Sequence, residues 1–492
     1  MKPRTTRRFA SPAAIVWFRD DLRLADNPAL TAGVASGHPL ICLYVLDEES
    51  EGVRPLGGAA KWWLHGALEE LEGSLHRVGG ELVIMRGKSA FLLERAAIET
   101  GATSVFWNRR YDGASRAIDA KIKATLTARG IAVESFCANL LHEPWTIKTA
   151  AGEPFRVFTP FWRAERSALE PTAPLPSPKR LTRHALPASI KRHIRTLTSL
   201  KLEPRAPDWA GGLRAAWQRG EKAGVARLSE FLESGLPDYA TDRDRPDKTA
   251  TSRLSPYLRF GNVSPRQVWQ AAETAVSSGA SRASARDLEK FRAELGWREF
   301  SYHLLFHHPQ LASENFEPRF VRMRWRHDPP ALRVWRRGLT GYALVDAGMR
   351  ELWSTGWMHN RARMVAASFL IKHLLIDWRE GERWFWDTLV DADPANNAAS
   401  WQWVAGSGAD AAPFFRIFNP VLQGQKFDPH AIYAKRWIPE LEPLPAELIY
   451  KRGGDLPELL ALEGRAQAYP PQIVDHDEAR RRALEAFRSL RS

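Results

Sequence analysis

Short apolar runs alternate with helix-length segments in the first part of the chain. The runs are AAIVWF, LICLYVL, ELVIMRG, SVFWN and IAVESF, which begin at Ala13, Leu40, Glu81, Ser104 and Ile131. Strands that are apolar along their whole length, and not only at every second position, are typical of a parallel sheet covered by helices on both faces. The pattern predicts an α/β domain with a doubly wound parallel sheet.

Beyond residue 235 the pattern changes to helical spacing, most clearly in residues 286–308 and 342–376. Between the two parts, residues 171–205 contain eight Lys or Arg, one Glu and repeated prolines. This composition is typical of a linker that crosses the surface and is not a packed element. We therefore expect an α/β domain over residues 1–140, an interdomain linker over 141–230 and a larger all-α domain over 231–492.

The composition is that of a globular protein, with 44% apolar and 26% charged residues among 492. A net charge of +13 favours a polyanionic partner such as nucleic acid, although a generally basic proteome would give the same excess. Only Cys42 and Cys137 are present, which excludes a disulfide framework and favours a cytoplasmic setting. No apolar run approaches the ~20 residues that a membrane span requires, so we expect a soluble protein.

Residues 391–403 read DADPANNAASWQW and hold the most unusual mixture in the chain. Buried acids and amides need partners to offset their desolvation, and exposed tryptophan is uncommon. A planar ligand with a polar edge and apolar faces would suit all of these side chains.

Three further stretches combine polar and aromatic residues. In TSRLSPYLRFGNVSP (251–265), hydroxyl and amide groups suit phosphate oxygens, but an ordinary N-cap at Ser255 before Pro256 explains the periodicity better. In FRAELGWREFSYHL (291–304), Glu294, Trp297 and Arg298 share a helical face. That face is either an i,i+4 ion pair beside a core tryptophan or a cavity rim with an acceptor, a ring and a cation.

In GWMHNRARMVAASF (356–369), one helical face carries Asn360, Arg363 and Met364. Asp391 and Asp393 are the acids available to partner these groups. The chain has no HxxxH or CxxC arrangement, so no metal site is expected, and no GxGxxG follows the first strand.

Taken together and in this order, these stretches resemble the cryptochrome/photolyase family over almost the whole chain. The matching segments are WFRDDLRLADNPAL, TSRLSPYLRFGNVS, ELGWREF, GYALVDAGMRELWSTGWMHNRARM, DWREGERWFW, DADPANNAASWQW and FRIFNPVLQGQKFDP.

The resemblance implies that the helical domain binds FAD. The implied cofactor contacts are Tyr239, Thr251, Ser252, Arg253, Leu254, Ser255, Phe291, Asn360, Arg363, Asp391, Asp393 and Asn397, with Asn397 facing flavin N5. It also implies a chain of electron-transferring tryptophans, in which Trp401 is nearest the flavin, Trp378 is in the middle and Trp325 is at the surface.

The resemblance further implies light-driven repair of cyclobutane pyrimidine dimers in DNA, in the manner of class I enzymes, by an electron from excited, reduced FAD. The dimer leaves the duplex to enter a pocket. The implied lesion and DNA contacts are Glu294, Trp297, Arg298, Asn360, Arg361, Met364, Trp403 and Gln423. Glu294 and Asn397 join the three tryptophans as the residues expected to act in catalysis.

Two other functions fit the same fold. One is a cryptochrome with a blue-light signalling role, and the other is a light-independent electron-transfer flavoprotein. A second, antenna chromophore is left open between methenyltetrahydrofolate, a deazaflavin and none: Asp112 could bind a folate, but Ala312 and Ser313 stand where folate-binding members tend to have a cation. We expect the protein to act as a monomer.

Overall fold

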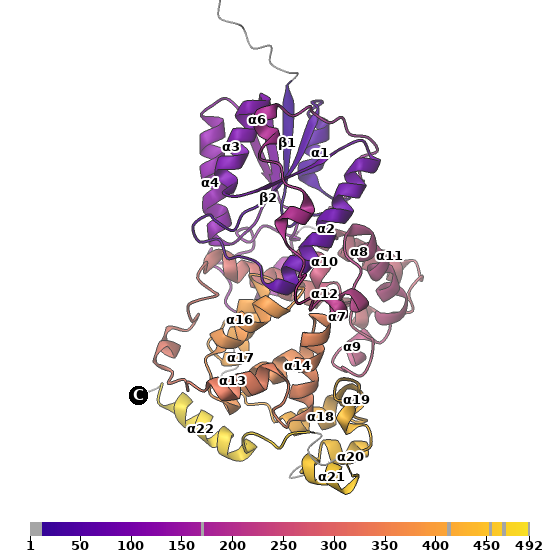
Figure 1. The fold of residues 1–492 in the computed structure, drawn as a ribbon, viewed down its shortest axis with the longest axis vertical. Coiled ribbons are helices and arrows are strands. Elements are labelled where there is room, and N and C mark those ends of the chain that lie inside the picture. The colour runs from indigo at the N-terminus through magenta and orange to yellow at the C-terminus, as the bar shows by residue number, and fades with distance from the viewer. Residues whose placement is uncertain (1–11, 169–171, 411–414, 452–454, 465–468, 491–492) are drawn as a thin grey trace, which may run out of the picture.

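A five-stranded parallel sheet forms the N-terminal part of the protein (Figure 1). The computed structural model describes residues 12–168, 172–410, 415–451, 455–464 and 469–490. The strand order is β3-β2-β1-β4-β5, and every neighbouring pair is parallel. The strands are β1 (Ala13–Phe18), β2 (Leu40–Leu46), β3 (Leu82–Arg86), β4 (Ala102–Asn108) and β5 (Ala132–Phe136). This arrangement confirms the predicted doubly wound α/β domain.

Four helices cover the two faces of this sheet: α1 (Pro28–Ala35), α2 (Gly58–Arg77), α3 (Ser89–Thr100) and α4 (Gly113–Thr127). Alternate residues of β1 enter different apolar clusters. Ala14, Val16 and Phe18 pack in the cluster that contains α2, whereas Ala13, Ile15 and Trp17 pack with α3 and α4. Both faces are buried, which is why the strand sequence is apolar without alternation.

The rest of the chain is mainly helical, as predicted. Its α-helices are α5 (Phe158–Arg166), α6 (Ala188–Lys191), α7 (Gly211–Ala216), α8 (Glu221–Glu230), α9 (Tyr239–Asp242), α10 (Ser255–Arg259), α11 (Pro265–Ser277), α12 (Ala285–His307), α13 (Pro329–Arg336), α14 (Ala343–Thr355), α15 (Asn360–Ser368), α16 (Trp378–Thr388), α17 (Asn396–Ala405), α18 (Pro420–Phe427), α19 (Ile432–Trp437), α20 (Ala446–Ile449), α21 (Leu456–Leu462) and α22 (His476–Arg488). Two π-helical turns, η2 (Phe231–Gly235) and η4 (Phe369–His373), extend α8 and α15, and 3₁₀ turns lie at η1 (Leu197–Leu200), η3 (Pro318–Arg322) and η5 (Pro439–Leu441).

The basic, proline-rich segment before residue 205 is packed, contrary to the expectation of a plain surface linker. Arg183 forms a bridge with Leu40, and Ile194 forms one with Met85. Leu181 and Ile190 are buried at 5% and 1% exposure. The apolar residues between the charges anchor the segment on the sheet, and composition alone concealed them. The division of the chain at residues 140 and 230 stays a prediction.

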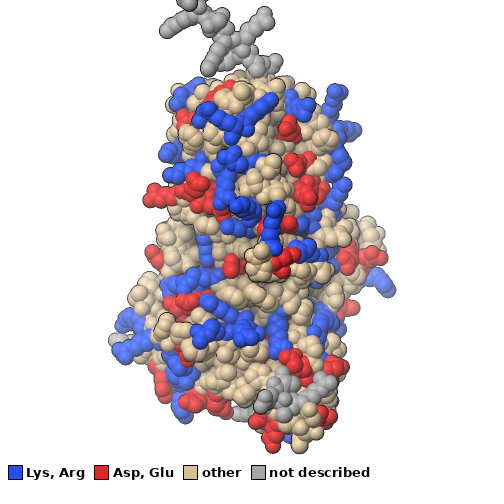
Figure 2. All heavy atoms as spheres, viewed as in Figure 1, with Lys and Arg blue, Asp and Glu red and all other residues tan. Residues whose placement is uncertain are grey.

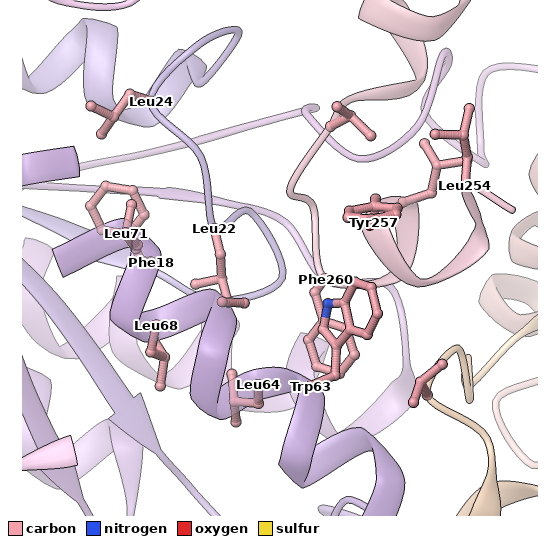
Figure 3. Packing of buried hydrophobic residues seen from close by; sticks show 14 of the residues in the cluster. Phe18, Leu22, Leu24, Trp63, Leu64, Leu68, Leu71, Leu254, Tyr257 and Phe260 are labelled. Carbon is pink, nitrogen blue, oxygen red and sulfur yellow. The ribbon is translucent and has the colours of Figure 1, made fainter. Parts of the chain in front are cut away.

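One apolar cluster joins the N-terminal domain to the helical part. Trp63 of α2 stacks on Phe260 at a centroid distance of 6.5 Å and meets Tyr257 of α10 edge to face at 4.9 Å (Figure 3). Its Nε1 donates to Asn262 Oδ1 at 3.1 Å. On the same helix, Leu68 belongs to the same cluster as the sheet residue Phe18. The two parts therefore share a core, and the domains are placed firmly against each other.

Lys and Arg side chains are distributed over both domains on the face in Figure 2, with acidic groups between them. Among the described residues, no helix combines the length and the apolar character needed to cross a bilayer.

Candidate functional site

Asp391, just after α16, connects two other elements of the helical domain. Its Oδ2 accepts hydrogen bonds from Ser255 Oγ of α10 at 2.6 Å and from Arg363 Nη2 of α15 at 2.8 Å. Asp391 is 7% exposed, and within the described part of the chain its buried Oδ1 has no hydrogen-bond partner. The predicted pairing of Arg363 with Asp391 is present. An unpaired carboxylate oxygen so well buried is costly unless a ligand donates to it.

Ser255 does not act as the N-cap that its sequence context favoured. The N-cap of α10 is Leu254, which makes no side-chain cap, and Ser255 is the first helical residue. Its hydroxyl is free to bind Asp391 because the cap position lies one residue earlier. Leu254 itself is 1% exposed, so its side chain belongs to the core.

The segment before α10 is held by an arginine that sequence reasoning missed. Arg227 of α8 donates to the backbone oxygens of Ser252 at 2.8 Å and Thr251 at 3.4 Å. Arg253 adopts a positive φ of 53° and lies over the Trp217 ring at 4.3 Å. Burial lowers the pKa of Arg253. Its Nε has no partner among the described residues and is available to a ligand.

Tyr239 and Phe291 form an aromatic wall. Tyr239 of α9 and Phe291 of α12 meet edge to face at 5.6 Å, and both rings contact Phe231. Tyr239 is 5% and Phe291 3% exposed. Burial raises the pKa of Tyr239, which therefore stays protonated as a hydrogen-bond donor.

Asp393 is engaged within its own loop. Its Oδ1 accepts from the backbone N–H groups of Ala395 and Asn396 at 2.9 and 2.8 Å, and Tyr302 donates to Oδ2 at 2.8 Å. Asp393 thus orders the start of α17. The cofactor contact expected from its side chain stays a prediction, with most of its hydrogen-bonding capacity already used.

Asn397, the second residue of α17, is 8% exposed. Its Nδ2 donates to Glu382 Oε1 at 2.8 Å and to the Glu382 backbone oxygen at 3.1 Å. Glu382 in turn binds Arg54 of the N-terminal domain. Neither Glu382 nor Arg54 was identified from the sequence, because no spacing rule links residue 54 to residue 382.

Glu294 pairs with residues other than Arg298. Its Oε1 is 2.6 Å from Arg243 Nη1 and 3.7 Å from Lys290 Nζ. Burial raises the pKa of Glu294, and the two cations oppose that rise. The i,i+4 pair with Arg298 is absent, so Glu294 faces the region beside α9.

The prediction that Arg298 contacts DNA is wrong. It is 8% exposed, and its Nη1 donates to the Asn139 backbone oxygen at 2.6 Å. Glu299 lies beside it at 3.4 Å. One position beyond Trp297 on the helix, the Arg298 side chain points toward the N-terminal domain. It links the two domains there and is not available to DNA.

Three other predicted DNA contacts lie on α15. Asn360 is exposed, and Met364 one turn later is half-buried beside it. Arg361 binds Asp244 at 2.7 Å and covers the Phe427 ring of α18 at 4.0 Å. Gln423 on the same helix α18 is half-buried and has a buried Oε1 without a partner in the described chain. Arg361 and Glu294 pair with Asp244 and Arg243, which are neighbours in the chain, so these two side chains border one region, called the rim below.

The two tryptophans predicted to line the lesion pocket contact two segments that are hydrogen-bonded to each other, one at Phe158 and one at Asp410. Trp297 stacks on Phe158 with a centroid distance of 3.7 Å and an interplanar angle of 10°. Trp403 Nε1 donates to the Asp410 backbone oxygen at 3.1 Å. Burial raises the pKa of Asp410, and a hydrogen bond from the Phe158 backbone lowers it. Both indoles are half-buried, so each keeps part of its surface open.

The three tryptophans of the predicted electron-transfer chain belong to one apolar cluster. Trp401 is 2% exposed and meets Phe385 of α16 edge to face at 4.9 Å. Trp378 is fully buried, and its Nε1 donates to Asn315 Oδ1 at 3.0 Å. Trp325 is half-buried at the edge of the cluster. Two buried tryptophans and a half-buried one in the same cluster fit a path from the interior to the surface, although the roles stay predictions.

The unpaired polar atoms and the aromatic wall together fit FAD. The buried Asp391 Oδ1 and Arg253 Nε lack partners in the described chain, and the Tyr239–Phe291 wall is apolar. Such a set suits a planar ring with a polar edge and a charged tail. Among the described residues, no group of three or more His, Cys, Asp or Glu could hold a metal ion. Asp112, the residue considered for a folate antenna, caps α4 by accepting from Ser115 N at 2.9 Å.

Comparison with known proteins covers both parts of the chain. The family model described as DNA photolyase matches residues 14–179, and the model of the FAD binding domain of DNA photolyase matches residues 291–489. A deoxyribodipyrimidine photo-lyase from Agrobacterium fabrum is 50% identical over 481 residues, which are 97% of this chain and 98% of that protein. Cryptochrome-1 from Arabidopsis thaliana is 38% identical over 97% of this chain and 70% of its own length. The crystal structure of a bacterial class III photolyase from Agrobacterium tumefaciens has a TM-score of 0.92 at 48% identity and covers 99% of both chains.

Proposed function

The chain belongs to the family of DNA photolyases and cryptochromes, and from this premise we propose that it is a deoxyribodipyrimidine photo-lyase that repairs cyclobutane pyrimidine dimers in DNA under light. The observation that carries this proposal is the arrangement of Glu294 and Arg361, which come from different helices and pair with the neighbouring residues Arg243 and Asp244, while the half-buried Trp297 lies three residues from Glu294 on α12. A protein that only transferred electrons would not need such a rim.

The proposed pocket would take a dimer that has left the duplex. A dimer already disturbs base stacking, which lowers the cost of its extrusion. Trp297 and Trp403 would replace the lost stacking, at about 1–3 kcal/mol per base. Glu294 would accept a hydrogen bond from the polar edge of the dimer, and the Arg243 and Arg361 guanidinium groups would attract the flanking phosphates.

When bound, reduced FAD supplies an electron to the dimer after it absorbs light. The protein binds and orients the two reactants. Asp391 and Arg363 would hold the polar edge of the ring, and Arg253 and the Thr251–Ser255 segment would hold the phosphates and ribose. Tyr239 and Phe291 would exclude water from one side. Trp401, Trp378 and Trp325 would carry electrons inward from the surface to keep the cofactor reduced.

The subclass is better matched by class III than by the class I that the sequence motifs suggested. The similar Agrobacterium tumefaciens structure is described as a class III photolyase, and its likeness extends over 99% of this chain. We therefore propose repair of cyclobutane dimers without assigning class I.

The test is light-dependent repair by the FAD-loaded protein. The protein is reduced without oxygen and mixed with DNA that contains a thymine cyclobutane dimer. Loss of the dimer under blue light, with recovery of intact thymines and no loss in the dark, is the expected result. Bound and photoreducible FAD without repair would contradict the proposal and favour a cryptochrome, the second function that the likeness to cryptochrome-1 supports.

A further inference from the structure

Arg54 of the N-terminal domain binds a buried carboxylate of the helical domain. Arg54 follows β2, and its Nη1 and Nη2 donate to Glu382 Oε1 and Oε2 at 2.7 and 2.9 Å. The Glu382 side chain is 3% exposed, whereas that of Arg54 is 34% exposed. The guanidinium also lies 4.0 Å from the centroid of the Trp386 ring. Two parallel bonds and a stacked ring fix the orientation of the carboxylate as well as its place.

The same carboxylate fixes the side-chain amide of Asn397. Both Glu382 atoms that touch this amide, Oε1 and the backbone oxygen, are acceptors. The amide nitrogen must therefore face Glu382, and Oδ1 must point away from it. No group in the described ranges of the chain donates a hydrogen bond to Oδ1, so the oxygen is available to a ligand.

The backbone beside Arg54 has little freedom to move. Trp386 Nε1 donates to the Pro55 oxygen at 2.9 Å, and Gly58 N donates to Asp387 Oδ1 at 2.8 Å. A Cβ on Gly57 would lie 2.1 Å from the Trp386 oxygen, so only glycine permits this approach. Arg54 is therefore held at a fixed place relative to α16.

We propose that Arg54 is a positioning residue for the flavin: through Glu382 it holds the Asn397 oxygen toward N5. This inference rests on the proposed function, in which FAD binds beside Asn397. Reduced flavin carries a hydrogen on N5 and can donate to that oxygen, whereas N5 of oxidised flavin is itself an acceptor. The N-terminal domain thus shifts the oxidation–reduction equilibrium toward the reduced form that the repair reaction uses.

Loss of Arg54 would remove the preference. Without the two-point contact the Glu382 carboxylate is no longer fixed in place, and it holds the Asn397 amide nitrogen less firmly. The amide is then free to turn its nitrogen toward N5, which favours oxidised flavin because the N5 of that form accepts a hydrogen bond.

The experiment compares two arginine variants of the FAD-loaded protein, Arg54→Met and Arg266→Met. Arg266 is a matched control because it also crosses the domain boundary to a buried carboxylate, with Nη2 2.9 Å from Asp26 Oδ1 and Nε 3.1 Å from Oδ2. The readouts are the midpoint potential of the bound FAD and the ¹⁵N chemical shift of N5 in labelled FAD. We expect Arg54→Met to favour oxidised FAD tenfold or more, about 30 mV for a two-electron couple. Arg266→Met should lower the unfolding temperature and leave both readouts unchanged.

Wild-type values of both readouts in Arg54→Met would overturn the inference. If Arg54→Met does not retain FAD, Arg54→Lys decides, because lysine keeps the charge and loses the two-point contact: a shift in the same direction supports the inference and a wild-type potential overturns it. Repair is measured separately on the wild type. A wild type that binds FAD but does not repair dimers contradicts the proposed function alone, whereas normal repair with an unshifted Arg54→Met potential contradicts this inference alone.

Discussion

At the scale of single residues, Glu294 has the environment of a side chain that binds a polar ligand. Burial raises its pKa, Arg243 and Lys290 lower it, and one oxygen remains for a further contact. Without the Glu294 carboxylate, a hydrogen-bond donor of the bound ligand has no partner in a partly desolvated pocket. The loss weakens the free energy of binding by about 1–3 kcal/mol.

We therefore expect Glu294→Ala to weaken binding of dimer-containing DNA by about tenfold or more, with unchanged FAD content. Fluorescence titration with damaged and undamaged DNA measures the affinity. Glu289→Ala is the matched control, since Glu289 lies on the same helix, is exposed and forms an ion pair with Arg166. Equal losses in the two variants would remove the lesion-binding role of Glu294.

A second residue-scale prediction concerns Trp325, the half-buried end of the tryptophan cluster. Trp325→Phe should slow photoreduction of oxidised FAD and leave repair by chemically reduced enzyme unchanged, because only the first process needs the path to the surface. Flash absorption spectroscopy follows the photoreduction. The control is Trp209→Phe, at an exposed tryptophan, which should retain the wild-type rate. A normal rate in Trp325→Phe would show that electrons reach Trp401 by another route.

At the scale of elements, α16 determines the position of several site residues. It begins at Trp378, carries Glu382 one turn later and presents Gly381 to the Trp401 ring of α17. A Cβ at Gly381 would lie 2.1 Å from Trp401 Cη2 and 2.4 Å from Cζ3. The two helices can approach this closely only because the side chain is absent.

Gly381→Ala should therefore destabilise the protein by about 1–3 kcal/mol and displace Trp401, with slower photoreduction as a second effect. Gly73→Ala on α2 is the control: its Cβ would meet only Arg77 Nη1, at 3.6 Å. That change should stabilise by about 0.5–1 kcal/mol, because alanine is the better helix former. Thermal unfolding of both variants measures the contrast, and equal shifts would disprove a steric role for Gly381.

The helices and their type could be predicted from periodicity, but the partners of polar side chains could not. The pairing of Arg363 with Asp391 was expected from the resemblance to the family and not from periodicity. Arg298 was assigned to DNA because it shares a helical face with Glu294 and Trp297, yet its side chain is buried. Arg54 lies 328 residues from Glu382, and only the folded chain brings them together.

At the scale of the whole molecule, buried neutral histidines make stability dependent on pH. His303 donates Nδ1–H to the Pro144 oxygen and accepts at Nε2 from Phe155 N, an arrangement that only neutral imidazole can form. Burial lowers the pKa of His303 to about 4. Burial likewise lowers the pKa of His359 to about 4 and that of His373 to about 3.

Between pH 6.5 and 4 these histidines are protonated in the unfolded chain but stay neutral in the folded protein. The free energy of unfolding therefore falls as the pH falls. This contribution is complete above pH 6.5 and amounts to roughly 3 kcal/mol for a histidine such as His303. We expect the unfolding temperature to drop between pH 7 and pH 5, with a smaller drop in His303→Gln than in the wild type. The control is His327→Gln, at an exposed position. NMR titration of the wild-type imidazoles provides the second measurement, and a His303 that titrates near pH 6.5 would contradict the prediction.

The basic segment between the two parts shows where composition misleads at this scale. Charge and proline content predicted a free linker, yet Leu181 and Ile190 are buried and the backbone bridges to β2 and β3. The apolar residues are scattered among eight cations and several prolines, so composition conceals them, yet Leu181, Ile190, Leu200 and Leu202 are all buried and anchor the segment.

The contact of Arg54 to Gly58 with α16 also limits how such proteins can be recombined. Exchange of N-terminal domains between relatives is one way to recombine such proteins. A donor domain without the arginine, or with any side chain in place of Gly57, would open the contact and leave Glu382 without its cation. Chimeras should therefore work best when this short loop is inherited with the helical domain, even though it lies within the N-terminal sequence.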